Sequence, residues 1–456
     1  MTASGDAQPG DPAVPDQPGA PSRRPRVALL LGNDGAHNSR SVRMATTLAE
    51  AGCAVVIVAR RAPGLADHEQ RTGYEIVRID APRPRWLPAP GLPASESQVT
   101  RRTVPAPVRP LGAIAREGPG RALQAVRYLL AARQWAGAIE DAIGHADAWQ
   151  ADGLVMLPVA LHLRGRLGGR AIYDALEIHV QSGRFARLPG PWRTLLARRE
   201  RTWARAADGV VTVSRPYADV LRPRLGVEPV IVMNCPPAPA APAGPSPRRL
   251  HALLGLPADA PVVLYHGYLF PHRGIERLFD AIAFLPRAHL VVMGFGAQFE
   301  TYTSMAAGLP DADRVHVIPG VPPDELLGWV ASADVAAMPI EGNTLNHRLT
   351  TPNKLFEALA AGVPVVASDL PGMAPIVRET GAGLLCDPDD PADIARAIGT
   401  ILDASPEERA GYRDRALAAA RETYNWERQA AAYLDVYEHL RLVERGPGSG
   451  SVGSGD

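Results

Sequence analysis

Lysine is almost absent from this chain of 456 residues. Lys354 is the only lysine, and every other residue in the Lys and Arg total of 48 is an arginine. Cysteine is scarce too, because Cys53, Cys235 and Cys386 lie far apart and are odd in number. These cysteines predict neither a disulfide framework nor a metal site, and they suit a reducing compartment.

Long apolar runs and an excess of charge are also missing. No run approaches the roughly 20 apolar residues of a membrane helix, and the N-terminus has no apolar signal core. The formal net charge is +0, which argues against a nucleic-acid partner. The common motifs G-x-x-x-x-G-K-[ST], H-E-x-x-H, paired C-x-x-C and G-x-S-x-G are absent as well. We expect a cytoplasmic protein.

Short apolar runs alternate with helical patterns through both halves of the chain. The first half predicts strands at 27–31, 54–58, 74–79, 153–157, 171–173, 210–213 and 230–233. The second half predicts strands at 261–265, 290–293, 315–318, 335–338 and 363–367. Such alternation is typical of parallel sheets with right-handed crossovers. The predicted fold class is α/β, with two doubly wound, Rossmann-like domains and ligands at the carboxyl ends of their strands.

Proline-rich and glycine-rich segments divide the chain. Residues 236–247 contain six prolines, which predicts a linker over 236–258 between a domain at 26–235 and a domain at 259–422. Residues 424–443 predict a last helix, in a segment that we place at 423–443. The remaining segments lack the apolar residues of a core. We expect a disordered tail at 1–25, a proline-rich insertion at 82–119 and a flexible tail at 444–456.

Lys354 lies where a cation is disfavoured. The pattern predicts a helix that starts with Thr351 as its N-cap and Pro352 in its first turn, and that ends before Gly362. The helix dipole disfavours a lysine in the first turn by roughly 0.3–1 kcal/mol. An anion bound between Lys354 and the free N–H groups would reverse that penalty. We favour an anion site, such as a phosphate site, over a solvated lysine.

Arg273 is predicted to lie at the same sheet edge. It belongs to the loop Gly267–Gly274, which follows the first strand of the second domain and opens a helix. Two cations at one edge suit a diphosphate, although a surface arginine would leave the same pattern. Glu357 follows Lys354 by one helical turn, where it could pair with the lysine or accept hydrogen bonds from sugar hydroxyls.

Other candidate residues follow predicted strands or titrate near neutral pH. The turn Gly294-Phe295-Gly296 resembles a dinucleotide-binding turn without its third glycine. The turn Asn33-Asp34-Gly35 permits close approach of a ligand. Five histidines could titrate usefully, but none forms an obvious triad: His37, His179, His266, His272 and His347.

Several of these motifs together resemble the bacterial GT-B glycosyltransferases of the group-1, family-4-like type. The resemblance covers residues 26–441, and its most specific part is the segment from Pro352 to Ser368. Gly267…Arg273-Gly274, Ala333-Asp334-Val335 and Asn234-Cys235-Pro236 support it. It implies a GT-B architecture with an interdomain cleft and a C-terminal helix that crosses back onto the first domain.

The resemblance also implies residue roles. Arg273 and Lys354 would be catalytic, on the diphosphate of a UDP- or GDP-linked sugar, with Glu357 on the ribose and the turns at 294–296 and 317–321 on the base. The donor contacts would be Gly267, Arg273, Gly294, Gly296, Val317, Val321, Asn346, Pro352, Asn353, Lys354, Leu355 and Glu357. The contacts to a hydroxyl acceptor would be Asn33, Asp34, Gly35, Arg40, Glu177 and His179.

The chemistry that the resemblance implies is transfer with retention at the anomeric carbon. Members of the family need no metal and no cofactor beyond the nucleotide-sugar substrate, and the donor's own phosphate is thought to deprotonate the acceptor. The products would be bacterial polysaccharides, glycolipids or secondary-metabolite glycosides.

Two positions depart from the family pattern. Leu349 stands where many relatives carry the first of two glutamates, and Leu176 stands where a histidine is common, with His179 as a substitute. These departures motivate a second hypothesis, a non-catalytic protein of the same fold that binds a nucleotide-sugar or a partner. A third hypothesis is an epimerase or phosphorylase on a similar frame.

Arginine is concentrated in the first domain. Residues 83–205 hold nineteen arginines against nine acidic residues. One hypothesis is that this face contacts anionic lipid headgroups or a lipid-linked acceptor, at the inner face of the cell membrane. The alternative is a solvated arginine face.

Overall fold

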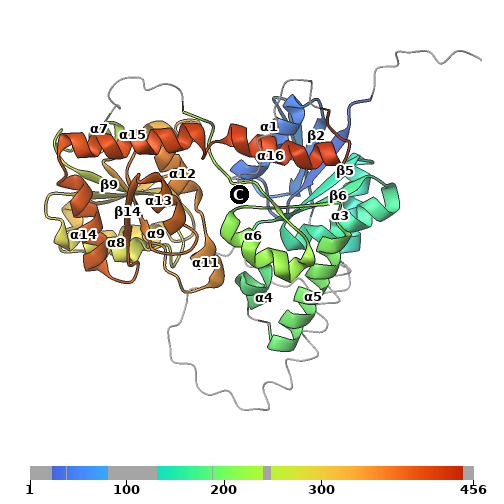
Figure 1. Ribbon diagram of the computed structural model, residues 1–456, viewed down its shortest axis with the longest axis horizontal. Helices are drawn as coiled ribbons and strands as arrows, with labels where there is room; N and C mark the ends of the chain where they lie inside the picture. The colour runs from blue at the N-terminus through green and yellow to red at the C-terminus, as the bar shows by residue number, and fades with distance from the viewer. Residues whose placement is uncertain (1–22, 37, 81–130, 187, 240–247, 445–456) are drawn as a thin grey trace, which may run out of the picture.

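The computed structural model describes residues 23–36, 38–80, 131–186, 188–239 and 248–444, and it shows two α/β domains side by side (Figure 1). The predicted insertion at 82–119 and nearly all of both predicted tails lie outside the described residues. The same holds for 240–247 within the predicted linker. Along the described ranges, no helix combines the length and the apolar character that crossing a membrane requires.

The first domain is built on an eight-stranded sheet with the order β3-β4-β2-β1-β5-β6-β7-β8. All neighbours are parallel except β3 and β4. The strands are β1 (Arg26–Leu30), β2 (Ala54–Arg60), β3 (His68–Arg71), β4 (Tyr74–Ile79), β5 (Ala148–Asp152), β6 (Arg170–Ala175), β7 (Gly209–Thr212) and β8 (Val230–Ile231). Helices of this domain include α1 (Ser39–Glu50), α3 (Gly153–Leu167), α4 (Gly183–Ala186), α5 (Gly190–Ala206) and α6 (Arg215–Leu221).

One predicted strand of the first domain is wrong. Residues 153–157 begin helix α3, and the strand is β5, directly before them. A short buried apolar run has the same pattern in a strand and in a buried helix. The real strand is interrupted in sequence by Gln150, which is nevertheless only 4% exposed. Gly153 separates the two elements, with a positive φ of 76° that turns the chain.

The second domain has a six-stranded parallel sheet with the order β11-β10-β9-β12-β13-β14. Its strands are β9 (Val262–Tyr268), β10 (His289–Phe295), β11 (Val315–Pro319), β12 (Val335–Met338), β13 (Val365–Ser368) and β14 (Gly383–Cys386). Its helices are α7 (Arg249–Leu254), α8 (Ile275–Ala281), α9 (Phe299–Ala307), α10 (Leu326–Val330), α11 (Leu345–Leu349), α12 (Asn353–Ala360), α13 (Ala374–Thr380), α14 (Pro391–Leu402) and α15 (Pro406–Glu422).

Both faces of the second sheet are covered by helices. Alternate residues of β9 enter two different core clusters, Val262 and Leu264 on one face and Val263 and Tyr265 on the other. Strands buried on both faces read as continuous apolar runs, which is why β9 to β13 could be predicted. The predicted pair of doubly wound α/β domains is confirmed.

The last helix joins the two domains. Helix α15 lies along the second domain, and α16 (Trp426–His439) continues over the first (Figure 1). Tyr433 and Tyr437 each donate a hydrogen bond of 2.7 Å to the Gln150 side-chain oxygen of β5. The Trp426 indole donates to Thr47 of α1 at 2.9 Å. The predicted crossover helix is confirmed.

Candidate functional site

Lys354 lies in the first turn of α12, at the carboxyl ends of the second sheet. The helix begins at Asn353 and Pro352 is its N-cap, so the predicted N-cap at Thr351 is wrong by one residue. Pro352 has an extended ψ of 144°, which delays the first helical residue to Asn353. The side chain of Leu355 lies fully buried in the core, whereas Asn353 is exposed.

The Lys354 side chain is largely buried, and its ammonium has no hydrogen-bond acceptor among the described residues. The residue is 8% exposed, and its Nζ lies 3.4 Å from the ring centroid of Tyr265. Burial lowers the pKa of Lys354 well below its usual value, the Arg273 guanidinium lowers it further, and Glu357 opposes both effects. The aromatic face is a weak substitute for a hydrogen-bond acceptor. An anion bound here would therefore give the ammonium a partner.

Arg273 lies close to Lys354, as the sequence predicts. It ends the loop from β9 and precedes Gly274, where an added Cβ would lie 1.9 Å from the Pro339 carbonyl oxygen. The loop therefore reaches the end of β12 only with glycine at this position. Within the described ranges Arg273 forms no ion pair. Burial lowers the pKa of His347 to about 4, and the nearby charge of Arg273 contributes to this lowering. Arg273 is thus a second cation near Lys354 at this edge.

Glu357 pairs with a histidine rather than with Lys354. Its Oε2 lies 3.0 Å from Nε2 of His266, a residue of β9. The Glu357 side chain is 14% exposed and the His266 side chain is 2% exposed. Burial lowers the pKa of Arg43, a residue of α1 in the first domain, and the charge of Glu357 opposes part of this effect. No local sequence pattern indicates Arg43, and the role of Glu357 on a ribose stays a prediction.

The glycine turn after β10 lies beside the Lys354 edge. Gly294 pairs in register with Gly267, and an added Cβ at Gly294 would lie 2.0 Å from the Gly267 carbonyl oxygen. Val317 packs against one core cluster of the second domain and Val321 against the other. The turn at 294–296 is therefore close to Lys354, whereas the turn at 317–321 lies two strands away from β9.

Helix α11 contacts the first domain. The Asn346 amide accepts a hydrogen bond of 2.8 Å from the Ile178 N–H and donates one of 3.3 Å to the Ile178 carbonyl oxygen. The Tyr217 hydroxyl donates to the Asn346 carbonyl oxygen at 3.1 Å. Leu345 and Leu349 pack against the core of the first domain. Asn346 is thus an interdomain residue here, and its predicted contact with the donor remains a prediction.

On the acceptor side, His179 has both ring nitrogens engaged. Its Nε2 accepts a hydrogen bond of 2.9 Å from the Leu154 N–H at the start of α3, and its Nδ1 lies 3.1 Å from Glu177. Burial tends to raise the pKa of Glu177, but hydrogen bonds with His179 and Ser182 leave it below its usual value. The predicted pair therefore presents no open imidazole nitrogen.

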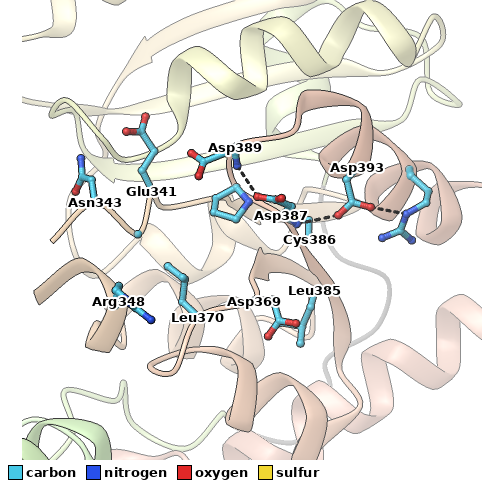
Figure 2. Close-up of a pocket in the computed structure, with 13 residues that line it drawn as sticks. Glu341, Asn343, Arg348, Asp369, Leu370, Leu385, Cys386, Asp387, Asp389 and Asp393 are labelled. Atoms are coloured by element: carbon cyan, nitrogen blue, oxygen red, sulfur yellow. Dashed lines mark hydrogen bonds and ion pairs between the residues drawn. The ribbon is translucent and has the colours of Figure 1, made fainter. Parts of the chain in front are cut away.

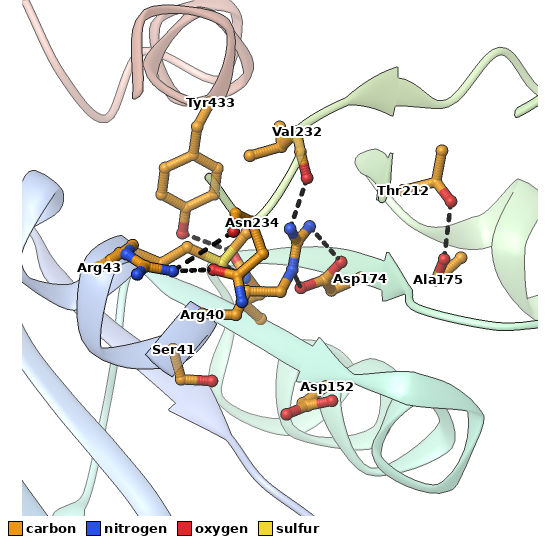
Figure 3. A network of polar contacts seen from close by, with 12 residues as sticks. Arg40, Ser41, Arg43, Asp152, Asp174, Ala175, Thr212, Val232, Asn234 and Tyr433 are labelled. Carbon is orange, nitrogen blue, oxygen red and sulfur yellow. Dashed lines mark hydrogen bonds and ion pairs between the residues drawn. The ribbon is translucent and has the colours of Figure 1, made fainter. Parts of the chain in front are cut away.

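Arg40 is held inside the first domain (Figure 3). Its Nε and Nη2 donate to the two Asp174 carboxylate oxygens at 2.8 and 2.9 Å, and its Nη1 donates to the Val232 carbonyl oxygen. Residue Arg40 is 6% exposed. A contact between Arg40 and an acceptor would require this buried ion pair to open. The nearby Arg43 instead donates to Asn234, a residue of the interdomain connection.

Asp152 is a candidate that the sequence reasoning missed. It ends β5, and its carboxylate accepts a hydrogen bond of 2.9 Å from the Asn38 amide. Burial and the neighbouring Asp174 raise the pKa of Asp152 to about 7. The raised pKa depends on residues far away in sequence, so no motif reveals it. Asn33 and Asp34, by contrast, fold into a local turn after β1, with side-chain oxygens bonded to the Gly35 and Ala36 N–H groups.

A cavity of about 750 Å³ lies at the ends of β13 and β14 (Figure 2). Its lining contains five carboxylates and two arginines, with none of the predicted donor or acceptor residues. The carboxylates belong to Glu341, Asp369, Asp387, Asp389 and Asp393. A cavity with an acidic excess repels a diphosphate. The cation pair, not this cavity, is therefore the candidate site.

The second domain matches a known protein family. Residues 260–404 match a family model described as glycosyl transferases group 1. Two similar curated proteins are D-inositol 3-phosphate glycosyltransferases. The one from Xylanimonas cellulosilytica is 32% identical over 245 residues, 51% of this chain and 57% of that protein. The one from Acidothermus cellulolyticus is 32% identical over 274 residues, 57% of this chain and 58% of that protein. The chain thus matches just over half the length of each relative.

Solved structures resemble nearly the whole chain. Sucrose-phosphate synthase from Thermosynechococcus elongatus superposes with a TM-score of 0.67 at 20% identity, over 92% of this chain and 99% of that chain. HepE from Anabaena, solved with UDP and glucose, superposes with a TM-score of 0.60 at 15% identity, over 92% of this chain and 100% of that chain. At these identities the likeness shows the fold, and it confirms the predicted GT-B architecture.

Proposed function

We propose that this chain, whose second domain belongs to the group 1 glycosyltransferases, moves a glycosyl group from a nucleotide-sugar to a hydroxyl acceptor. One observation carries the proposal: Lys354 is largely buried with no acceptor in the part of the chain that the structure describes, and Arg273 is close enough to lower its pKa. Both lie at the carboxyl ends of a parallel sheet, where such folds bind ligands. The negative charge of a bound diphosphate would balance the positive charges of both side chains.

The same geometry supports a mechanism. When the bond between sugar and diphosphate breaks, negative charge develops on the departing phosphate oxygen. Lys354 and Arg273 would stabilise this charge from fixed positions, which is an efficient form of transition-state stabilisation. We further propose transfer with retention, in which a donor phosphate oxygen takes the acceptor proton. Charge stabilisation by the two side chains would make a bound metal unnecessary.

The acceptor would bind on the first domain, at the ends of β1, β5 and β6. We propose a lipid-linked acceptor or an anionic membrane surface as its setting, because α5 is strongly basic. Its exposed arginines are Arg193, Arg198, Arg199, Arg201 and Arg205. Its one acidic residue, Glu200, is buried and accepts a hydrogen bond from Tyr173 at 2.8 Å. Leu195 is 45% exposed on the same helix, which lies on the side of the domain away from α16 (Figure 1).

Calorimetric titration with UDP, GDP, ADP and dTDP tests the donor site first. We expect one or more of them to bind, and no binding at millimolar concentration would refute the proposal. Nucleoside diphosphate release from the matching nucleotide-sugars then tests for catalysis. Binding without release would favour the non-catalytic hypothesis, and an altered sugar without release would favour an epimerase.

Retention, metal independence and the membrane contact need separate assays. Nuclear magnetic resonance of the product reports the anomeric configuration, and inversion would contradict the proposed mechanism. Activity should persist in a chelator such as EDTA. Vesicle flotation should show binding to anionic but not to neutral vesicles, and reversing the charge of Arg198 and Arg199 should reduce it. Equal binding to neutral vesicles would exclude the electrostatic contact.

A further inference from the structure

The residue directly before Arg273 has an unusual backbone conformation. His272 has a φ of 65°, in the left-handed region where residues other than glycine are uncommon. Along the described ranges, Arg441 is the one other non-glycine residue with a positive φ. Strained residues persist only where the surrounding structure holds them, and they gather at functional sites. The place of His272, beside a side chain assigned to the diphosphate, therefore points to a functional reason for its conformation.

Glu341 holds His272 in this conformation. It follows β12, on the loop that also carries Asn343 (Figure 2). The Nδ1 atom of His272 lies 2.7 Å from the Glu341 carboxylate. Because an ionised carboxylate can only accept, Nδ1–H is the donor. In return, the Glu341 N–H donates to the His272 carbonyl oxygen at 3.3 Å. The two residues are thus joined through both their side chains and their backbones.

The loop is fixed on both sides of Arg273. The pair of His272 and Glu341 fixes it on the side before the arginine. On the side after it, Gly274 lies so close to Pro339 that an added Cβ would be 1.9 Å from the Pro339 carbonyl oxygen. Both anchoring residues belong to the segment that leaves β12. Such anchors restrict where the backbone of Arg273 can lie, and therefore where its guanidinium can reach.

The stability of the fold does not explain the conformation of His272. Its side chain is 54% exposed, and that of Glu341 is 20% exposed. An ion pair or hydrogen bond that is open to solvent adds little to the free energy of unfolding. Glycine at this position would adopt the same φ without strain. The chain thus keeps a strained residue, with a side chain that contacts Glu341, directly before Arg273.

We propose that His272 is a positioning residue, which acts with Glu341 to hold Arg273 against the departing diphosphate. The proposal rests on the proposed function, because it requires Arg273 to stabilise charge in the transition state. Donors held in fixed positions stabilise developing charge well, since they need no reorganisation at the moment of reaction. Releasing the loop should therefore slow the transfer more than it weakens binding of the donor.

Steady-state kinetics with the nucleotide-sugar that wild type uses tests this assignment. His272→Gly removes the imidazole and relieves the strain. Its kcat should fall roughly 10- to 100-fold, the scale expected for a misplaced catalytic group, while KM for the donor stays within about twofold. Its thermal unfolding midpoint should stay close to that of wild type.

Two matched variants separate positioning from backbone strain. His272→Asn tolerates a positive φ and keeps an N–H donor at the same number of bonds from the backbone. Its kcat should therefore stay within about threefold of wild type. Arg441→Gly removes the other positive-φ side chain, which lies beyond the end of α16. Both kinetic constants should be unchanged in that variant.

A double variant tests whether His272 acts through Arg273. Residues that act as one unit have non-additive effects. In an Arg273→Ala background, His272→Gly should therefore cause little further loss of kcat. Glu341→Ala should reproduce the loss seen in His272→Gly, and the two substitutions together should be no worse than either alone. Additive losses in either combination would overturn the proposal, because they indicate separate contacts with the substrate.

The outcomes distinguish this proposal from the proposed function. If wild type transfers no sugar, both fail together. If wild type is active and His272→Gly is equally fast, only the positioning role fails. A raised KM with unchanged kcat would also overturn it, because His272 would then bind the donor directly. A thermal unfolding midpoint of His272→Gly far below that of wild type would assign the pair to the fold instead.

Discussion

Replacing Lys354 with methionine should increase stability and weaken diphosphate binding. Methionine keeps a chain of similar length over the Tyr265 ring, so the packing is conserved. The desolvation penalty of a buried ion amounts to several kcal/mol, and a desolvated cation–π contact offsets about 2 kcal/mol of it. With the nearest cation opposing the charge as well, we expect Lys354→Met to raise the free energy of unfolding by roughly 1–2 kcal/mol at pH 7.

The pH dependence of this difference has a definite sign. Because burial lowers the pKa of Lys354 in the folded state, the folded protein binds fewer protons than the unfolded one between that pKa and the usual value of 10.5. Wild-type stability should therefore rise with pH in this window. The methionine variant lacks this rise. Urea denaturation of both proteins from pH 7 to 10 should show their difference shrinking as the pH increases.

Ligand binding provides the complementary measurement. A bound diphosphate favours the charged lysine, so binding to wild type should take up protons, which calorimetry in buffers of different ionisation enthalpy detects. Losing a charge-assisted contact of about 1.5–3 kcal/mol should weaken binding roughly 10- to 150-fold in Lys354→Met. A methionine variant that is less stable than wild type and binds diphosphate equally well would refute the reasoning, because the lysine would then serve the fold.

Four further substitutions test other parts of the structure. Because the pKa of Asp152 is raised to about 7, wild-type stability should lose a component as the pH rises from about 4 to 7. Asp152→Asn should lack this loss in urea denaturation, and parallel profiles would contradict the assignment. Asp174→Ala should destabilise the protein by about 3–5 kcal/mol, since it leaves the Arg40 charge buried and unpaired. Adding Arg40→Met should recover part of this loss in thermal unfolding. Tyr217→Phe removes one hydrogen bond to Asn346 and should cost about 0.5–1.5 kcal/mol, measurable as easier domain opening by small-angle scattering.

The fold could be predicted wherever strands are buried on both faces. Strands β1, β2 and β12 are continuous apolar runs, and their positions follow from the sequence. Strand β5 could not be found because Gln150 interrupts it, and the reason for that glutamine lies in α16, more than 280 residues away. Strand β3 is polar along its whole length, since it forms the antiparallel edge of the sheet.

Some residues of the candidate site could likewise be predicted from the sequence, and others could not. Lys354 and Arg273 could be singled out because a cation at a helix start conflicts with local electrostatics. The partner of Glu357 is His266, 91 residues away, and no local pattern indicates such a pairing. The same applies to Arg43 and to the raised pKa of Asp152, which arise only when separate strands and helices meet.

The contact between helix α11 and the first domain should make domain closure depend on temperature. Leu345 and Leu349 bring apolar surface to the first domain, and Asn346 adds neutral hydrogen bonds. Closure through such a contact should carry a negative heat-capacity change and respond little to ionic strength. Because apolar association weakens on cooling, the fraction of molecules with separated domains should grow in the cold. A glutamate at position 349 would have made the same contact sensitive to salt and to pH.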